Sequence, residues 1–194
     1  AASDVYKRQE YFRPPLSTTE PNFEARNVRV LGNLIRGGDS AFAFVGAVEC
    51  VAAHNTIVQP HNWLFRILQE TVSDDTHIFY AAQNCEVTNN LFFFDRGDLS
   101  TWINIGANTQ PATFVYRNNL WYAFDAPAQS RPSQITPSSQ AVIGLDPGLA
   151  APLSDDISLA ADSPARGTGA SQTWLTHGLG GGAYADPPNL GARE

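Results

Sequence analysis

The sequence contains no methionine, a single lysine, two cysteines and no long apolar run. Two cysteines are too few for a disulfide scaffold, and neither they nor the four histidines have the spacing of a zinc site. No segment approaches the ~18 consecutive apolar residues of a transmembrane helix, so we expect no membrane span. With 19 acidic and 12 basic side chains the net charge is -7, which argues against a nucleic-acid partner. A hydrophobic content of 43% in 194 residues indicates one ordinary folded domain.

The two ends of the chain differ from its middle. Residues 1–9 contain the only lysine and have neither helical nor strand periodicity, so we interpret them as a non-native tract. Residues 10–24, rich in Pro, Ser and Thr, predict a loop that leads into the first strand. We assign residues 25–194 to the C-terminal part of a single domain. Because Met is absent, we expect the natural chain to extend further upstream.

A short repeat built on asparagine recurs along the chain. Each copy has an Asn followed by two mostly apolar residues, and the successive copies begin 22, 35 and 29 residues apart, at Asn33, Asn55, Asn90 and Asn119. Apolar or aromatic residues stand five and three positions before each Asn, whereas the position between them is mixed. The residues five positions before are Val28, Cys50, Cys85 and Phe114. This alternation has the period of a strand with one buried face.

Constant strands joined by loops of variable length predict an all-β parallel β-helix. We expect about four coils, starting near residues 25, 47, 81 and 110, and a terminal coil after the polar loop 125–140. Stacked coils place equivalent residues about 4.8 Å apart, so the Asn side chains form a hydrogen-bonded ladder. Cys50 then lies over Cys85. Side chains in such a stack point the same way, so we expect two free buried thiols rather than a disulfide.

From residue 25 onward the chain resembles the right-handed parallel β-helix proteins of the pectate-lyase-like superfamily. Besides the coil pattern, segments 145–149, 157–159 and 163–167 resemble a closing coil, and 188–194 resembles a final strand. Segments 65–70 and 118–122 resemble a subgroup of secreted bacterial β-helix repeat proteins. The resemblance implies a secreted or periplasmic monomer whose partner is a polysaccharide, bound along one sheet and the loops beside it.

The expected sugar-binding face carries polar and aromatic side chains. Alternation points Phe65 and Ile67 inward and leaves Leu64, Arg66 and Leu68 outward. In the next coil, Ile103 and Ile105 point inward and Trp102 and Asn104 outward. Candidate substrate-binding residues are Trp102, Asn104, Asn62, Asp39, Asp95 and Asp98, and candidate catalytic residues are Arg66, His61, Arg96 and Glu70. Trp63 and Trp121 are expected to be packing residues.

These residue types suit an acidic sugar polymer. Trp offers a flat apolar face to a sugar ring, Arg pairs with a uronate carboxylate, and Asp accepts from hydroxyls or binds calcium, the one cofactor that the residues suggest. The favoured reaction is β-elimination on a uronic-acid polymer, in which Arg66 or calcium neutralises the carboxylate and His61 or Arg96 removes the neighbouring proton. A glycoside hydrolase using Asp95, Asp98 or Glu70 is the alternative enzyme.

Other features favour less specific roles. The Gly-His-Gly and Arg-Ile-Lys signatures of polygalacturonases are absent, as is the Lys-based pattern of alginate and chondroitin lyases, so a non-catalytic carbohydrate-binding or cell-surface scaffold is a further hypothesis. Arg66 and Glu70 suit a surface ion pair across the strand. Trp102 suits packing under a neighbouring loop as well as a sugar platform. Residues 95–98 suit a solvated turn, and His61 a plain loop position.

Overall fold

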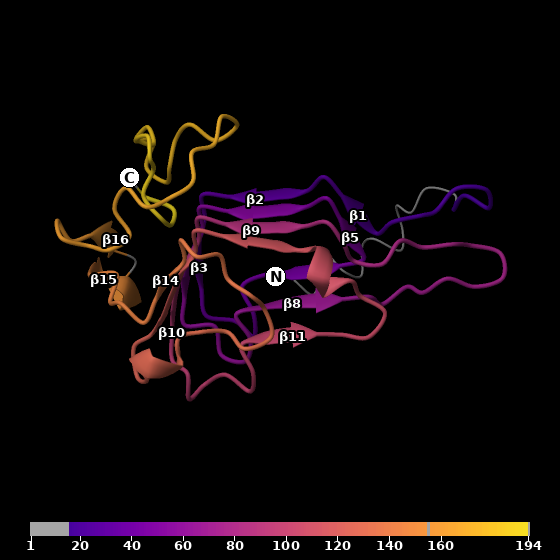
Figure 1. Cartoon of the computed structure of the whole chain (residues 1–194), viewed down its shortest axis with the longest axis horizontal. Coiled ribbons are helices and arrows are strands. Elements are labelled where there is room, and N and C mark those ends of the chain that lie inside the picture. The colour runs from indigo at the N-terminus through magenta and orange to yellow at the C-terminus, as the bar shows by residue number, and fades with distance from the viewer. Residues whose placement is uncertain (1–15, 155, 194) are drawn as a thin grey trace.

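The regular secondary structure is mostly β-strand, and almost all of the strands run parallel. The computed structural model describes residues 16–154 and 156–193, so the tract 1–9 and the first part of the 10–24 loop lie outside the described residues. Figure 1 shows strands from successive repeats lying side by side, with the C-terminal segment packed at one end of them. The chain is all-β, contains several parallel sheets and is compatible with a β-helix solenoid.

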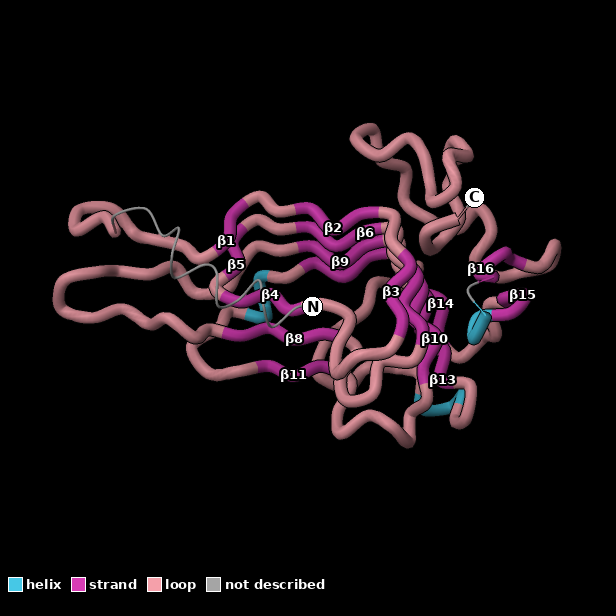
Figure 2. The backbone as a smooth tube through the Cα atoms, turned by 180° about the vertical axis from the view of Figure 1, so that it is seen from behind, coloured by secondary structure: helices cyan, strands magenta, loops and turns pink. Residues whose placement is uncertain are grey.

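Three parallel sheets form the body of the molecule (Figure 2). The first sheet contains β2 (Arg29–Leu31), β6 (Val51–Ala53), β9 (Glu86–Thr88) and β12 (Val115–Arg117). The second sheet contains β3 (Leu34–Arg36), β7 (Thr56–Val58), β10 (Leu91–Phe94), β13 (Leu120–Ala123) and β14 (Val142–Ile143). The third sheet contains β4 (Ala43–Val45), β8 (Phe65–Leu68) and β11 (Ile103–Ile105). A short parallel pair, β1 (Ala25–Arg26) and β5 (Ala47–Val48), precedes the first sheet.

The strand register follows the asparagine repeat. Leu34 pairs with Thr56, Thr56 with Leu91, and Leu91 with Leu120, so the residues that follow each repeat Asn lie one above another. Loops absorb the unequal lengths of the repeats. One long example, residues 69–82, projects beyond the sheets after β8 (Figure 1). The predicted combination of constant strands and variable loops is therefore confirmed.

The predicted asparagine ladder is present. Oδ1 of Asn55 accepts from the main-chain N–H and the side-chain amide of Asn33, at 3.0 and 2.9 Å. Oδ1 of Asn90 accepts the same pair of bonds from Asn55, both at 2.9 Å, and Oδ1 of Asn119 accepts them from Asn90, at 2.9 and 3.0 Å. Each ladder amide also donates to a main-chain carbonyl, so these buried polar groups are satisfied.

The residue before each ladder Asn makes the corner between the first and second sheets. Gly32, His54, Asn89 and Asn118 occupy this corner, with φ angles of 64°, 52°, 55° and 46°. Only Gly and, to a lesser degree, Asn adopt this left-handed conformation readily. The corner therefore explains why Gly and Asn precede the ladder in three of the four repeats, and it leaves His54 as the exception.

Aromatic and aliphatic side chains fill the interior in register. The rings of Phe92 and Trp121 stack at 4.2 Å with an interplanar angle of 5°, and Trp121 is a core residue as expected. Phe65 and Ile67 point inward as predicted. Two predictions of side-chain direction are wrong. Strand alternation does not apply at either position, because Val28 lies between β1 and β2 and is 49% exposed, whereas Leu64 sits in a bend before β8 and is buried.

The two cysteines form the expected interior stack. Both are free and buried, and the main-chain N–H of Cys50 lies 3.4 Å from Sγ of Cys85. A hydrogen bond from the Cys85 thiol lowers the pKa of Cys50 to about 7, whereas that same contact and burial raise the pKa of Cys85. The prediction of paired thiols without a disulfide is confirmed.

The C-terminal part departs from the stacked arrangement. β15 (Leu149–Ala151) and β16 (Asp156–Leu159) pair antiparallel with each other instead of extending a parallel sheet. Residues 188–193, which resemble a final strand in sequence, contain no strand. The segment beyond β16 instead folds back against the body (Figure 1). Short 3-10 helices, η1 (Pro111–Thr113), η2 (Pro127–Gln129) and η3 (Pro152–Ser154), lie in the connecting loops.

Candidate functional site

The candidate residues gather on the outer side of the third sheet and in the loops that precede its strands. These loops stack as the strands do. The main-chain N–H of His61 bonds to the carbonyl of Gly38 at 2.8 Å, that of Trp63 to the carbonyl of Asp39 at 2.8 Å, and that of Ser100 to the carbonyl of Asn62 at 3.2 Å. Main-chain pairing therefore holds the candidate side chains of neighbouring repeats at fixed relative positions.

Arg66 projects from β8 and stacks on an indole. Its guanidinium carbon lies 4.5 Å from the centre of the Trp63 ring, and Arg66 is in register with Asn104 on β11. The predicted ion pair between Arg66 and Glu70 is absent among the described residues. Nε of Arg66 is buried without a hydrogen-bond partner in the described part of the chain. Stacking orients the guanidinium and leaves donor capacity for an anion.

A second guanidinium and indole pair lies in the loop before β11. The guanidinium carbon of Arg96 lies 4.1 Å from the centre of the Trp102 ring, and its Nη1 donates to the carbonyl of Leu99 at 2.7 Å. The indole N–H of Trp102 donates to the carbonyl of Gln129 at 3.1 Å, so the loop 125–140 covers part of this ring. The alternative that Trp102 packs under a neighbouring loop is thus correct in part, because the ring supports Arg96 as well.

His61 and Asp98 meet at the edge of this surface. Nδ1 of His61 lies 3.6 Å from Oδ2 of Asp98, and both side chains are about half exposed or more. This separation is longer than a hydrogen bond, so the carboxylate lies beside the imidazole without fixing its orientation. From sequence, both residues were expected at the sugar-binding face, but their closeness to each other was not predicted.

The remaining acidic and amide candidates stabilise loops. Oδ1 of Asp95 accepts from the Gly97 N–H at 2.8 Å, as in a solvated turn. The carbonyl of Asp39 accepts from two main-chain N–H groups, and the Asn62 side chain accepts from the Ser100 hydroxyl.

Glu70 follows β8 at the end opposite to the His61 loop, roughly 13 Å of strand away. It does not join the other candidates.

Asp125 belongs to this region and was not a candidate from sequence. Its carboxylate accepts from the main-chain N–H groups of Arg96 and Gly97, at 2.6 and 3.1 Å. Burial pushes the pKa of Asp125 upward, but these hydrogen bonds and one from Asp95 outweigh it and leave the pKa below its ordinary value. The only signal in the sequence was its position at the start of the polar stretch 125–140.

The donor set does not fit a metal ion. Among residues 16–154 and 156–193, no group of three or more His, Cys, Asp or Glu side chains could hold one. Asp95 and Asp125 direct their oxygens at backbone N–H groups instead of converging on a cation. A calcium-dependent step has no support from this arrangement.

An apolar hollow of about 370 Å³ lies elsewhere, between the second sheet and the β15 region. The rings of Phe93 and Phe124 stack at 5.0 Å in its wall. The remaining lining residues are Gln59, Ala151, Pro152, Leu153 and Ser154. None of the candidate site residues lines this hollow, so it is separate from the surface built around Arg66.

Comparison with known proteins leaves the family open. No protein-family description, no curated protein and no solved structure matches this chain. The described residues contain no helix long and apolar enough to cross a membrane. Function is therefore inferred from the geometry of the surface around Arg66 and from the sequence resemblance.

Proposed function

We propose that the outer side of the third sheet binds a polysaccharide that contains uronic acid. The observation that carries this proposal is the presence of two stacked guanidinium and indole pairs, Arg66 with Trp63 and Arg96 with Trp102, in neighbouring repeats. Guanidinium groups pair with carboxylates, and successive uronate units supply carboxylates along a chain. Asn104, in register with Arg66, adds an amide that can bond to sugar hydroxyls.

We further propose that the fold is a right-handed parallel β-helix of the pectate-lyase-like superfamily, with about four coils, and that the protein is secreted or periplasmic and monomeric. The asparagine ladder and the parallel register support this assignment. An experimental structure would test the handedness and the coil number. Fractionation of the source cells would test the location, with recovery in the cytoplasm contradicting it.

The reaction that we propose for this surface is β-elimination. Arg66 neutralises the carboxylate of the bound uronate, which makes the hydrogen on the neighbouring ring carbon more acidic. His61, which lies beside Asp98, takes that proton, a carbon–carbon double bond forms, and the glycosidic bond breaks. The leaving sugar oxygen then takes up a proton. Arg96 binds a neighbouring carboxylate, because a guanidinium is a poor base.

The decisive experiment measures binding and product separately. The full chain is incubated with a panel of polyuronates, product is followed by the ultraviolet absorbance of the unsaturated uronate, and binding by retardation in polymer-containing gels. Arg66→Ala should weaken binding by about tenfold or more, as expected when a hydrogen-bonded charge is removed. The matched control is Arg117→Ala, which removes an exposed arginine from the first sheet. Equal binding by both variants would show that Arg66 does not belong to the binding site.

A non-catalytic binding scaffold is the second candidate function. The observation in its favour is that Nδ1 of His61 lies 3.6 Å from Oδ2 of Asp98, beyond hydrogen-bond distance, so Asp98 does not fix the proposed base in one orientation. Under this alternative the polymer binds and no unsaturated product forms. Hydrolysis by two carboxylates has less support, because Asp98 contacts His61 and Asp95 accepts from a backbone N–H. New reducing ends without ultraviolet absorbance would indicate hydrolysis.

A further inference from the structure

Residues 163–193, here named the C-terminal cover, pack on the outer side of the second sheet. Ala165 and Leu190 form an apolar cluster with Leu91 and Leu120, and all four are buried. Ala192 forms another cluster with Val58 and Ile157. Removal of the cover would expose apolar side chains on an outward sheet face, a surface that soluble proteins rarely leave bare.

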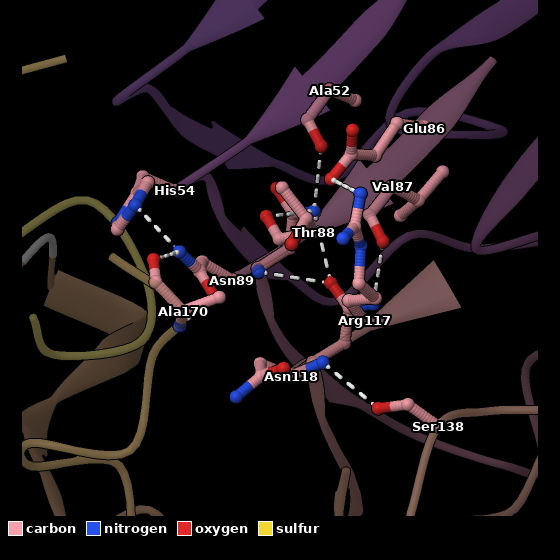
Figure 3. A network of polar contacts seen from close by, with 12 residues as sticks. Ala52, His54, Glu86, Val87, Thr88, Asn89, Arg117, Asn118, Ser138 and Ala170 are labelled. Carbon is pink, nitrogen blue, oxygen red and sulfur yellow. Dashed lines mark hydrogen bonds and ion pairs between the residues drawn. The ribbon is translucent and has the colours of Figure 1, made fainter. Parts of the chain in front are cut away.

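Hydrogen bonds fix the cover to the corner column between the first and second sheets (Figure 3). The side-chain amide of Asn89 donates to the carbonyl of Ala170 at 2.8 Å, and the N–H of Ala170 donates back to Oδ1 of Asn89 at 2.8 Å. One repeat further, the amide of Asn118 donates to the carbonyl of Thr168 at 2.9 Å. The carbonyl of Asn89 also accepts from the N–H of Gly191 at 2.8 Å.

His54 occupies the same column under the cover and must be neutral there. Its side chain is buried, with 1% exposed, and its Nε2 lies 2.8 Å from the Asn89 amide nitrogen. Because Ala170 fixes the orientation of that amide, Asn89 presents N–H to His54, and Nε2 has to accept. A proton on Nε2 would set two donors against each other. The cover therefore disfavours the imidazolium form of His54.

The surroundings of His54 offer no compensating negative charge in the described structure. The cover contributes Tyr184, whose ring centre lies 4.3 Å from that of His54. The neighbouring repeat contributes the neutral Asn89, and the nearby charges of Glu86 and Arg117 pair with each other at 3.2 Å. Burial lowers the pKa of His54 to about 4, although the backbone of Gly191 and Asn189 offsets part of this effect.

We propose that protonation of His54 in acid releases the C-terminal cover. The neutral form of His54 holds the cover at neutral pH, and protonation breaks the contact with Asn89 and opens the outer side of the second sheet. Because the bound state disfavours the proton, attachment is strongest above the ordinary histidine pKa of about 6.5 and weakens as the pH falls toward 4. The ratio of covered to open molecules should fall on the order of 100-fold between neutral pH and about pH 4.5.

Amide hydrogen exchange on the full chain tests this proposal. Protection factors, corrected for intrinsic exchange, are compared between neutral pH and about pH 4.5 for the cover and for the body strands β7 and β10. We expect the cover to lose protection on the order of 100-fold while the body strands keep theirs. Unchanged protection of the cover, or simultaneous loss in the body, would overturn the proposal.

The variant His54→Asn distinguishes the effect of protonating His54 from other effects of acid on the cover. Asn occupies the equivalent corner position in the next two repeats, at Asn89 and Asn118, so the substitution suits the backbone and supplies a residue that does not titrate. The acidic contacts Asp186 with Ser171 and Asp156 with Arg193 remain in this variant. If protonation of His54 releases the cover, the variant keeps the same protection from amide exchange in the cover at both pH values. An acid response equal to that of the unchanged protein would assign the release to other titratable groups, those carboxylates or His177, and reject His54.

Discussion

The amide side chains of Asn90 and Asn119 are joined so that one oxygen serves two donors. Oδ1 of Asn119 accepts from both the main-chain N–H and the side-chain amide of Asn90, at 2.9 and 3.0 Å. Asn90 in turn accepts the same two bonds from Asn55. Each of these hydrogen-bonded pairs therefore links the corner of one repeat to the corner of the next repeat.

Replacing Asn90 by Ala should destabilise the fold strongly. The substitution removes the acceptor for two buried donors of Asn55 and leaves Oδ1 of Asn119 without its side-chain donor. We expect the free energy of unfolding to fall by about 3 kcal/mol, measured by urea unfolding. Asn33→Ala is the control, because Asn33 lies at the partly exposed end of the ladder. Equal losses from the two variants would contradict a cooperative ladder.

The stacked thiols should resist disulfide formation. Cys50 and Cys85 project in the same direction from adjacent repeats, and both lie in the core. After mild oxidation of the folded chain, denaturation and alkylation, mass spectrometry should find an alkyl group on each cysteine. A chain that takes up none would show that a disulfide had formed.

Replacing Trp63 by Leu should weaken polymer binding without unfolding the protein. Leu keeps apolar bulk but removes the aromatic face under Arg66, and a partly exposed cation–π contact contributes about 1 kcal/mol. We expect affinity for polyuronates to fall about fivefold, measured by gel retardation. Trp174→Leu is the matched control, because it removes an indole that stacks with Arg29 instead. A similar loss of affinity in the control would argue against a specific role for Trp63.

Gly191→Ala should loosen the C-terminal cover. An added Cβ would lie 2.6 Å from Oγ1 of Thr56, and Gly191 has a φ of 93°. We expect a loss of about 2 kcal/mol in the free energy that attaches the cover, measured as faster amide exchange in residues 163–193. Gly180→Ala is matched in strain, with a φ of 98°, but has nothing within 4 Å of the added Cβ. Faster exchange for both variants alike would assign the effect to backbone strain alone.

The stacked part of the fold could be predicted because its signal is local and repeated. The spacing of Asn33, Asn55, Asn90 and Asn119 gave the register, and this register in turn placed Cys50 over Cys85. Alternation failed at Leu64 and at Val28, because both residues lie outside the strands. A repeat specifies contacts between its copies and nothing about its ends.

The candidate site could be predicted in composition but only partly in geometry. Sequence placed Arg66, Asn104 and Trp102 on one face, and β8 and β11 hold Arg66 and Asn104 there in register. The stacking of Arg66 on Trp63 was missed, because it depends on how a loop bends before β8. The attachment of the C-terminal cover was also missed, since it joins Asn89 to Ala170 across 81 residues without any repeated pattern.

The two ends of the strand stack are unlike each other. At one end, the loop 125–140 bonds to Trp102 and Thr101 and places Ile135 against the core. At the other, β2 and β3 are outermost in their sheets, and Val28 is exposed. The β2 and β3 end is therefore the one at which a further parallel strand could be added to the described sheets, whereas the loop 125–140 covers the opposite end.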